Sequence, residues 1–287
     1  MRKIVRSTFL TAVAIGATVF SNGGATADDL KSIKDKGYAR VVVANEQPYG
    51  FIDAENKGAG IGPDVAAAVL RKIGVTNIQW SSVAFAGLIP GVKADRFDFA
   101  AAEQAILPER CAQVQFTQPN SSYTSGLLVL KGNPKKLHSF DDLLKVQGTT
   151  LAVVSGADEI IPDAYQVPRE NRVYIQSKAD AIATLTSGRA DAYYATELTI
   201  ADLVKQSSEV ESAEMTGPPI VNGKPFRKYG AFTFRPQDKE LFGAFSAALN
   251  EFKKTDEYEK ILTRYGLSKD SIQAARDGST EKLCAGE

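Results

Sequence analysis

Two oppositely charged side chains are the strongest candidates for chemistry in this sequence. Glu46 follows the apolar run 40–44, and the aromatic residues Tyr49 and Phe85 follow this run and a later one. A carboxylate beside aromatic faces can hold a cation, although such rings more often fill a core. Arg110 can hold a carboxylate through two parallel hydrogen bonds, unless it is a plain surface residue. Together they predict a site for a small solute that carries both charges.

Four further polar positions follow predicted strands: Glu103, Ser155, Gly156 and Thr196. The backbone N–H groups at Ser155 and Gly156 precede a predicted helix and could bind an anion, or these residues could simply cap that helix. An ionised Glu103 that points inward would make the site one charge more negative and admit a ligand with a second cationic group. If Glu103 points away, Arg110 and Glu46 alone suit a zwitterion.

Several other classes of function have little support. His138 is the only histidine, so histidine-based catalysis and metal clusters are not expected. No phosphate-binding glycine loop or dinucleotide fingerprint is present, and we expect no cofactor. Without the three basic residues of the leader described next, 31 basic residues face 34 acidic ones, a balance that does not attract nucleic acid or anionic membranes.

The first 27 residues have the three-part layout of a secretory signal peptide. Three basic residues precede the apolar run 9–20, and Ala25-Thr26-Ala27 forms a small-residue cleavage site. The run is too short to span a bilayer, and no cysteine follows it to accept a lipid. We expect cleavage after Ala27 and a free periplasmic chain of 260 residues.

The chain contains two cysteines, Cys111 and Cys284. An even count in an oxidising compartment favours a disulfide between them, and two inert buried thiols are the alternative. The bridge would join the C-terminal tail to the residues beside Arg110.

The elements that must position these side chains alternate between strands and helices. This pattern predicts α/β lobes with mostly parallel sheets flanked by helices. The predicted strands, with helical segments between them, are 40–44, 77–80, 97–100, 150–154, 172–175 and 190–194. In such sheets ligands bind beyond the carboxyl ends of the strands. The candidates named above follow these ends.

The order of elements in the first half returns in the second half. The segment 89–99 matches 182–192 at a constant offset of 93 residues, as two related lobes require. The same offset makes Glu103 and Thr196 equivalent, and we expect them to face each other across a cleft.

We expect a discontinuous lobe 1 of residues 28–130 and 231–287 and a lobe 2 of residues 131–230. Apolar helices around Leu241 and Tyr258 return the chain to lobe 1. The chain then crosses between lobes near 128–132 and near 228–232, and two crossings suit a hinge.

Four motifs in order give a family resemblance over essentially the whole mature chain: Gly87-Leu88-Ile89-Pro90-Gly91, Pro108-Glu109-Arg110, Lys131-Gly132-Asn133-Pro134 and Gly188-Arg189-Ala190-Asp191. They resemble the polar amino-acid class (family 3) of solute-binding proteins of ABC transporters. The resemblance implies the two-lobed, type II periplasmic binding protein fold. It also implies a monomer that delivers a solute to an inner-membrane permease without being an enzyme.

Within this class, the segments 45–49, 108–112 and 281–285 most resemble binders of ectoine and hydroxyectoine. That resemblance implies Arg110 on the ligand carboxylate, Glu46 on the cationic ring, and Tyr49 with Phe85 as aromatic walls. Ala105 departs from the pattern where such binders place a third aromatic wall. Thr196 stands where binders of α-amino acids place the acid that holds the ammonium group.

A ligand-loaded subunit that reports to a membrane sensor would differ from a transport receptor only in its docking partner. Two further alternatives concern what is bound or converted. One is a binder of an amino acid or a cationic amine. The other is an enzyme similar to cyclohexadienyl dehydratase, which resembles these binders in fold and needs a general acid such as Glu103 or Glu197.

Overall fold

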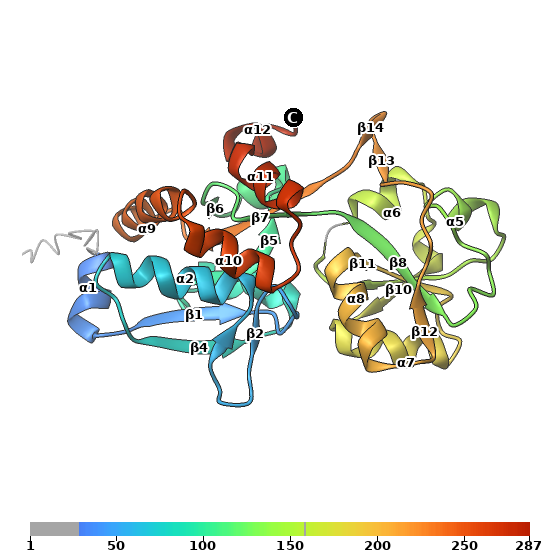
Figure 1. Ribbon diagram of the computed structural model, residues 1–287, viewed down its shortest axis with the longest axis horizontal. Coiled ribbons are helices and arrows are strands. Elements are labelled where there is room, and N and C mark those ends of the chain that lie inside the picture. Colours follow the sequence, from blue (N-terminus) through green and yellow to red (C-terminus); the bar gives the residue numbers. More distant parts are fainter. Residues whose placement is uncertain (1–28, 158) are drawn as a thin grey trace, which may run out of the picture.

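Two sheets, each covered by helices, form the molecule (Figure 1). The computed structural model describes residues 29–157 and 159–287. Within these ranges, no helix is long and apolar enough to cross a membrane. The predicted signal peptide and its cleavage after Ala27 lie outside the described residues.

The first sheet has six strands in the order β4-β1-β5-β15-β6, with β7 also paired to β15. Strand β1 pairs in parallel with β4 and with β5, whereas β15 runs antiparallel to β5, β6 and β7. The strands are β1 (Ala39–Val43), β4 (Ile78–Ser82), β5 (Phe99–Ala105), β6 (Gln115–Phe116), β7 (Ser121–Tyr123) and β15 (Lys228–Phe234). A short pair, β2 (Phe51–Ile52) and β3 (Gly58–Ala59), lies after β1.

Alternating side chains on these strands bury both faces of the first sheet. Val41 and Phe99 pack with Phe245 on one face, whereas Val42 and Ala100 contribute to a second cluster on the other. The helices that supply side chains to the first cluster are α1 (Asp29–Lys36), α2 (Ile61–Lys72), α9 (Lys239–Phe252), α10 (Asp256–Arg264) and α11 (Lys269–Asp277). The 3₁₀ helix η1 (Phe85–Gly87) and α3 (Leu88–Lys93) cover the second. The C-terminal helices thus return to this sheet.

The second sheet has five strands in the order β10-β9-β11-β8-β12. Strand β9 pairs in parallel with β10 and β11, and β8 runs antiparallel to β11 and β12. The strands are β8 (Ser125–Leu130), β9 (Leu151–Val154), β10 (Arg172–Ile175), β11 (Ala192–Thr196) and β12 (Val210–Ser212). The helices beside them are α5 (Asp142–Lys145), α6 (Ile160–Ala164), η2 (Arg169–Asn171), η3 (Lys178–Asp180), α7 (Ala181–Thr186) and α8 (Glu197–Gln206). A hairpin of β13 (Ile220–Val221) and β14 (Lys224–Pro225) follows.

The predicted α/β fold is confirmed, and both sheets are mixed. Each contains three parallel strands, and the strands through which the chain changes sheet, β8 and β15, run antiparallel to them. The internal repeat is visible in the elements, because η1, α3 and β5 begin 93 residues before η3, α7 and β11. We refer to the first sheet with its helices as lobe 1 and to the second as lobe 2.

The chain changes sheet slightly earlier than the segments from which we predicted the crossings. The first change falls at Thr124, between β7 and β8, and the second falls before Lys228, where β15 begins to pair with β7. The polar and apolar residues 121–130 form two strands with a break at Thr124, which sequence alone could not locate. We therefore place the proposed lobe boundaries at Thr124 and at residues 226–227.

The predicted disulfide between Cys111 and Cys284 is confirmed, with the two Cα atoms 5.7 Å apart. It joins α4 (Pro108–Cys111) to α12 (Thr280–Ala285). Thr280 adds a hydrogen bond from its hydroxyl to the Thr117 carbonyl, 2.7 Å long. The C-terminal helix is therefore fixed beside the short helix that carries Arg110.

Replacing both cysteines, Cys111→Ser with Cys284→Ser, should lower the free energy of unfolding. The bridge spans 173 residues, and the chain-entropy model assigns about 5 kcal/mol to a loop of that size. Urea denaturation of wild type and variant measures the difference. A reductant should destabilise the wild type and leave the double variant unchanged; equal stability of the two oxidised proteins would contradict the prediction.

Candidate ligand-binding site

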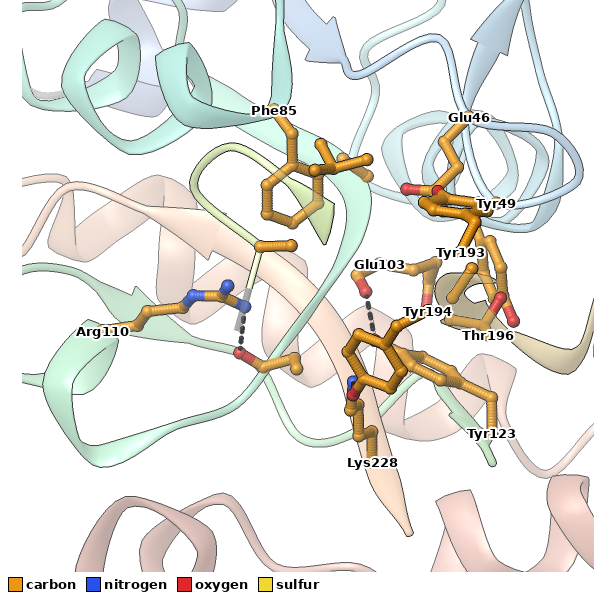
Figure 2. A pocket seen from close by; sticks show the side chains of 15 residues that line it. Glu46, Tyr49, Phe85, Glu103, Arg110, Tyr123, Tyr193, Tyr194, Thr196 and Lys228 are labelled. Carbon is orange, nitrogen blue, oxygen red and sulfur yellow. Dashed lines mark hydrogen bonds between the residues drawn. The ribbon is translucent and has the colours of Figure 1, made fainter. Parts of the chain in front are cut away.

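A cavity lies between the two lobes where strands β5 and β11 end (Figure 2). Its lining comes from both lobes. The lining residues are Glu46, Tyr49, Phe85, Ala102, Glu103, Ala105, Arg110, Tyr123, Val154, Ala157, Tyr193, Tyr194, Ala195, Thr196 and Lys228. Six of the predicted site residues are thus brought together, and Glu103 and Thr196 both border the cavity, as expected from the repeat.

Arg110 lies at one side of this cavity, on the same side as Phe85. Its Nη1 donates to the Ala105 carbonyl at 3.1 Å and its Nη2 donates to the Gly156 carbonyl of lobe 2 at 3.2 Å. The guanidinium carbon lies 5.4 Å from the centre of the Phe85 ring. A guanidinium has five N–H groups, so three have no protein partner among residues 29–157 and 159–287. These groups can bind a carboxylate in the cavity.

Glu46 lies at the opposite side, in the loop after β1. The loop is closed by two backbone hydrogen bonds between Glu46 and Gly50, of 2.8 and 2.9 Å. It packs against β5 so tightly that a Cβ on Gly50 would lie 2.5 Å from the Ala101 carbonyl oxygen. Glycine at position 50 therefore allows the approach that holds Glu46 at the cavity.

The Glu46 side chain is half-buried, and its carboxylate is enclosed between the lobes. Oε1 accepts a hydrogen bond from the Thr199 hydroxyl at 2.8 Å. Burial raises the pKa of Glu46, whereas the Thr199 hydrogen bond and the charges of Lys178 and Lys228 lower it. Thr199 and Lys178 belong to lobe 2, so the ionised form of this acid depends on groups from both lobes.

Aromatic rings line much of the space between Arg110 and Glu46. The rings of Tyr49 and Tyr123 are 5.1 Å apart, and Tyr193 and Tyr194 approach from β11. Burial raises the pKa of Tyr49 and of Tyr193 well above the ordinary value for a phenol. Both hydroxyls are therefore neutral at physiological pH, and the rings offer faces for a cation.

Glu103 borders the cavity, but its carboxylate is bound within lobe 1. Oε1 accepts from the Asn120 side chain at 2.6 Å and Oε2 accepts from the Ser121 hydroxyl at 2.5 Å. The backbone at Glu103 is left-handed, with φ of 49°, which turns the side chain toward these donors. Burial raises the pKa of Glu103 to about 7 despite the two hydrogen bonds.

Thr196 begins helix α8 as its N-cap. Its hydroxyl accepts the Thr199 N–H at 3.2 Å and donates to the Thr199 hydroxyl at 2.9 Å. This use as a cap explains why a hydroxyl residue suits the position. It also places an uncharged hydroxyl at the border of the cavity.

Ser155 and Gly156 are not brought into the cavity lining. The Ser155 N–H donates to the Ile175 carbonyl and the Ala157 N–H donates to the Val154 carbonyl, so these two N–H groups already have acceptors. The Gly156 carbonyl instead accepts from Arg110, and Gly156 packs on Ala86, where a Cβ would lie 2.6 Å from the Ala86 Cα. Its contribution is a contact between the lobes.

Reasoning from strand ends missed four polar residues of the lining: Tyr123, Tyr193, Tyr194 and Lys228. The two residues of β11 lie just before its end, and counting only residues beyond the strand excluded them. Lys228 begins β15 at the second crossing, donates to the Tyr194 hydroxyl and lies 4.7 Å from the centre of that ring. A lysine at a predicted crossing was the signal that could have identified it.

Comparison with known proteins identifies relatives along most of the chain. Residues 39–268 match the bacterial extracellular solute-binding proteins, family 3. A probable amino-acid ABC transporter periplasmic-binding protein, y4tE of Sinorhizobium fredii, is 42% identical over 282 residues, which cover 97% of this chain and 90% of that one. The L-arginine-binding protein of Pseudomonas aeruginosa is 25% identical over 238 residues, 80% of this chain and 88% of that one.

Solved structures show the same fold. The crystal structure of EhuB in complex with hydroxyectoine has a TM-score of 0.80 and 31% identity, covering 90% of this chain and 98% of that one. An ancestral amino acid-binding protein, described as a precursor of cyclohexadienyl dehydratase, has a TM-score of 0.68 and 26% identity, covering 82% and 98%.

Replacing Glu103 with Gln should reduce the pH dependence of stability. A carboxyl with a raised folded pKa stabilises the fold below its unfolded pKa, and that stability is lost as pH rises through the folded pKa. With a folded pKa of about 7 for Glu103, the free energy of unfolding of the wild type should fall by about 2 kcal/mol between about pH 5 and about pH 7.5.

Urea denaturation at the two pH values measures this loss, and Glu103→Gln should show much less of it. Glu109→Gln, which changes an exposed acid of lobe 1, is the matched control. Its free energy of unfolding should fall between the two pH values by as much as that of wild type. An equal fall in the free energy of unfolding in Glu103→Gln and wild type would refute Glu103 as the source of this pH dependence.

Proposed function

This chain belongs to family 3 of the bacterial extracellular solute-binding proteins, and we propose that it captures a small zwitterion of the ectoine or 5-hydroxyectoine type. It is a non-enzymatic transport receptor of an ABC transporter, acting on polar, amino-acid-like solutes. The identity of the solute is the step beyond this. A transport receptor needs no general acid, so Glu103 and Glu197 have no catalytic role in this proposal.

The observation that carries the proposal is the pair of opposite charges in one cavity. Arg110 and Glu46 border it from opposite sides, and tyrosine rings line the space between them. A carboxylate would bind the guanidinium through its remaining N–H groups. A cationic ring would lie between the Glu46 carboxylate and the aromatic faces of Tyr49 and Phe85.

Lys228 changes the charge balance of the cavity in favour of this ligand class. Among the acidic and basic side chains of the lining, Arg110 and Lys228 oppose Glu46 and Glu103. A buried site is stable when its charges are compensated, so a ligand with no net charge fits. A second cationic group on the ligand would meet Lys228, and the Glu103 carboxylate is already bound by Asn120 and Ser121.

Two features bear on the choice within zwitterions. Thr196 supplies no acid for an α-ammonium group, whereas Glu46 can receive a positive charge that is delocalised over a ring. EhuB, which was crystallised with hydroxyectoine, is similar over 90% of this chain. Ala105 supplies no aromatic ring at its own position, so the further ring contacts to the solute would come from Tyr123, Tyr193 and Tyr194.

An amino acid is the second candidate. The 42% identical relative is named as a probable amino-acid ABC transporter protein, and the P. aeruginosa relative as an L-arginine-binding protein. An amino acid would also place its carboxylate on Arg110. The difference would lie in the cation that faces Glu46. In an amino acid it is an ammonium group on a flexible chain, whereas in ectoine it is a charged ring.

Direct contacts between the lobes support capture by closure. Lys178 of lobe 2 donates to the Gln47 carbonyl of lobe 1 at 3.2 Å, and Arg110 of lobe 1 donates to Gly156 of lobe 2. These contacts lie on the two sides of the cavity. The solute would first meet both charges on lobe 1, and lobe 2 would then close over it. The closed monomer would be the form that an inner-membrane permease recognises.

A thermal-shift screen should separate the candidate solutes. Ectoine, 5-hydroxyectoine, L-arginine, glycine betaine and putrescine are tested at equal concentration. A solute at about 1,000 times its Kd stabilises the folded state by about 4 kcal/mol, so ectoine or 5-hydroxyectoine should give the largest rise in Tm. A larger rise with putrescine would overturn the zwitterion, and a larger rise with L-arginine would favour the amino acid.

Removing either charge should weaken binding of the best solute. Truncating one partner of a buried, hydrogen-bonded charge pair costs several kcal/mol, so Arg110→Ala and Glu46→Gln should each raise Kd by about 100-fold. Isothermal titration calorimetry measures both. Arg71→Ala removes an exposed arginine of α2 and should leave Kd unchanged. Wild-type affinity in Arg110→Ala would remove that residue from the site.

A further inference from the structure

A chain of hydroxyl groups in lobe 2 ends on the Glu46 carboxylate of lobe 1. The Thr196 hydroxyl donates to the Thr199 hydroxyl at 2.9 Å, and the Thr199 hydroxyl donates to Glu46 Oε1 at 2.8 Å. Thr199 is completely buried in the first turn of α8. Its contact with Glu46 joins residues 153 positions apart, and it crosses from one lobe to the other.

The direction of these hydrogen bonds is fixed by the residues themselves. A hydroxyl has one proton to donate. The Thr199 oxygen already accepts the proton of Thr196, and Thr196 in turn accepts the Thr199 N–H at 3.2 Å. The single Thr199 proton is therefore directed at Glu46, because an ionised carboxylate has no proton to donate and can only accept.

The remaining groups around Glu46 influence its charge without making the same contact. Lys178 and Lys228 act on it through their positive charges. Tyr49 and Tyr193 are the neighbouring titratable rings; burial raises the pKa of each, and the nearby carboxylate raises it further. Lys178 is paired with Asp202 and donates to the Gln47 carbonyl. The hydrogen bond to the Glu46 carboxylate from lobe 2 thus comes from Thr199.

We propose that Thr199 is a positioning residue of the solute site, whose hydroxyl fixes the Glu46 carboxylate in the orientation that receives the cationic part of the solute. The proposal rests on the proposed function, in which Glu46 is the cation-binding acid. Oε1 is held by Thr199, which leaves Oε2 to the ligand. Because Thr199 lies on lobe 2, the acid is fully ordered only when the lobes meet.

Closure and cation binding are therefore coupled through one hydroxyl. In an open arrangement Glu46 loses the Thr199 contact, and on closure it gains that contact as water leaves the cleft. A buried carboxylate without a donor is costly, so in the closed state the Thr199 hydrogen bond offsets part of the cost that burial imposes on an ionised Glu46. The cationic part of the solute then binds Glu46, whose carboxylate is oriented by Thr199 of lobe 2.

A double-mutant cycle tests the proposal. Thr199→Val keeps the branched shape and removes the hydroxyl, and Thr199→Ser keeps the hydroxyl. Each is made in wild type and in the Glu46→Gln background, and calorimetry measures binding of ectoine and, as a second probe, L-arginine. Thr199→Val should raise Kd by about 10-fold in wild type and have little effect in the Glu46→Gln background, while Thr199→Ser stays near wild type.

The pH profile separates positioning from simple packing. Without the Thr199 donor the pKa of Glu46 rises further, so the loss of affinity in Thr199→Val should grow as the pH is lowered and shrink toward wild type as the pH is raised. The carboxyl carbon resonance of Glu46, assigned with Glu46→Gln, is titrated in parallel. Its midpoint should rise in Thr199→Val and not in Thr199→Ser, whichever solute binds.

Each outcome decides a different point. An unchanged Glu46 midpoint in Thr199→Val overturns the proposal, as does an equal loss of affinity in both backgrounds, which would mean that Thr199 acts on folding or closure alone. Unchanged binding in Glu46→Gln would instead contradict the proposed function. Melting curves of each variant identify loss of the fold.

Discussion

The enclosure of the Glu46 carboxylate between two lobes is the constraint on which the rest of the site depends. A carboxylate removed from water requires hydrogen bonds and nearby positive charge. The Thr199 hydroxyl, Lys178 and Lys228 provide these from the opposite lobe and from the second crossing. The Gly50 loop brings the acid to the cavity in the first place. Each lobe alone would leave this group incompletely satisfied, so the acid links the binding of a cation to the approach of the lobes.

Arg110 completes the arrangement from the other side of the cavity. It is held by the Ala105 and Gly156 carbonyls and by the Phe85 ring, on a helix of four residues that the disulfide joins to α12. Both charges proposed to bind the solute therefore belong to lobe 1. To the cavity lining itself, lobe 2 contributes a neutral hydroxyl, rings and small side chains, which would exclude water and strengthen the ionic contacts on closure.

Much of this architecture was predictable because it follows from local patterns. The 93-residue repeat paired Glu103 with Thr196, since equivalent strands in two related lobes end at the same cleft. The fold and the disulfide followed from strand–helix alternation and from the cysteine count. The direction of the Glu103 side chain did not, because it depends on a left-handed backbone and on donors 17 and 18 residues away. Ser155 lies outside the cavity lining because its N–H bonds to the Ile175 carbonyl, which the sequence does not reveal. Lys228 was missed because its role depends on contact with Tyr194 across the crossing.

A crystal structure of the protein with ectoine bound tests the paired-charge site most directly. We expect the ectoine carboxylate within hydrogen-bonding distance of the Arg110 guanidinium and the cationic ring against Glu46, with Thr199 still donating to the same carboxylate. A solute bound in the reverse direction, with its carboxylate on Lys228 and no contact to Arg110, would contradict this assignment.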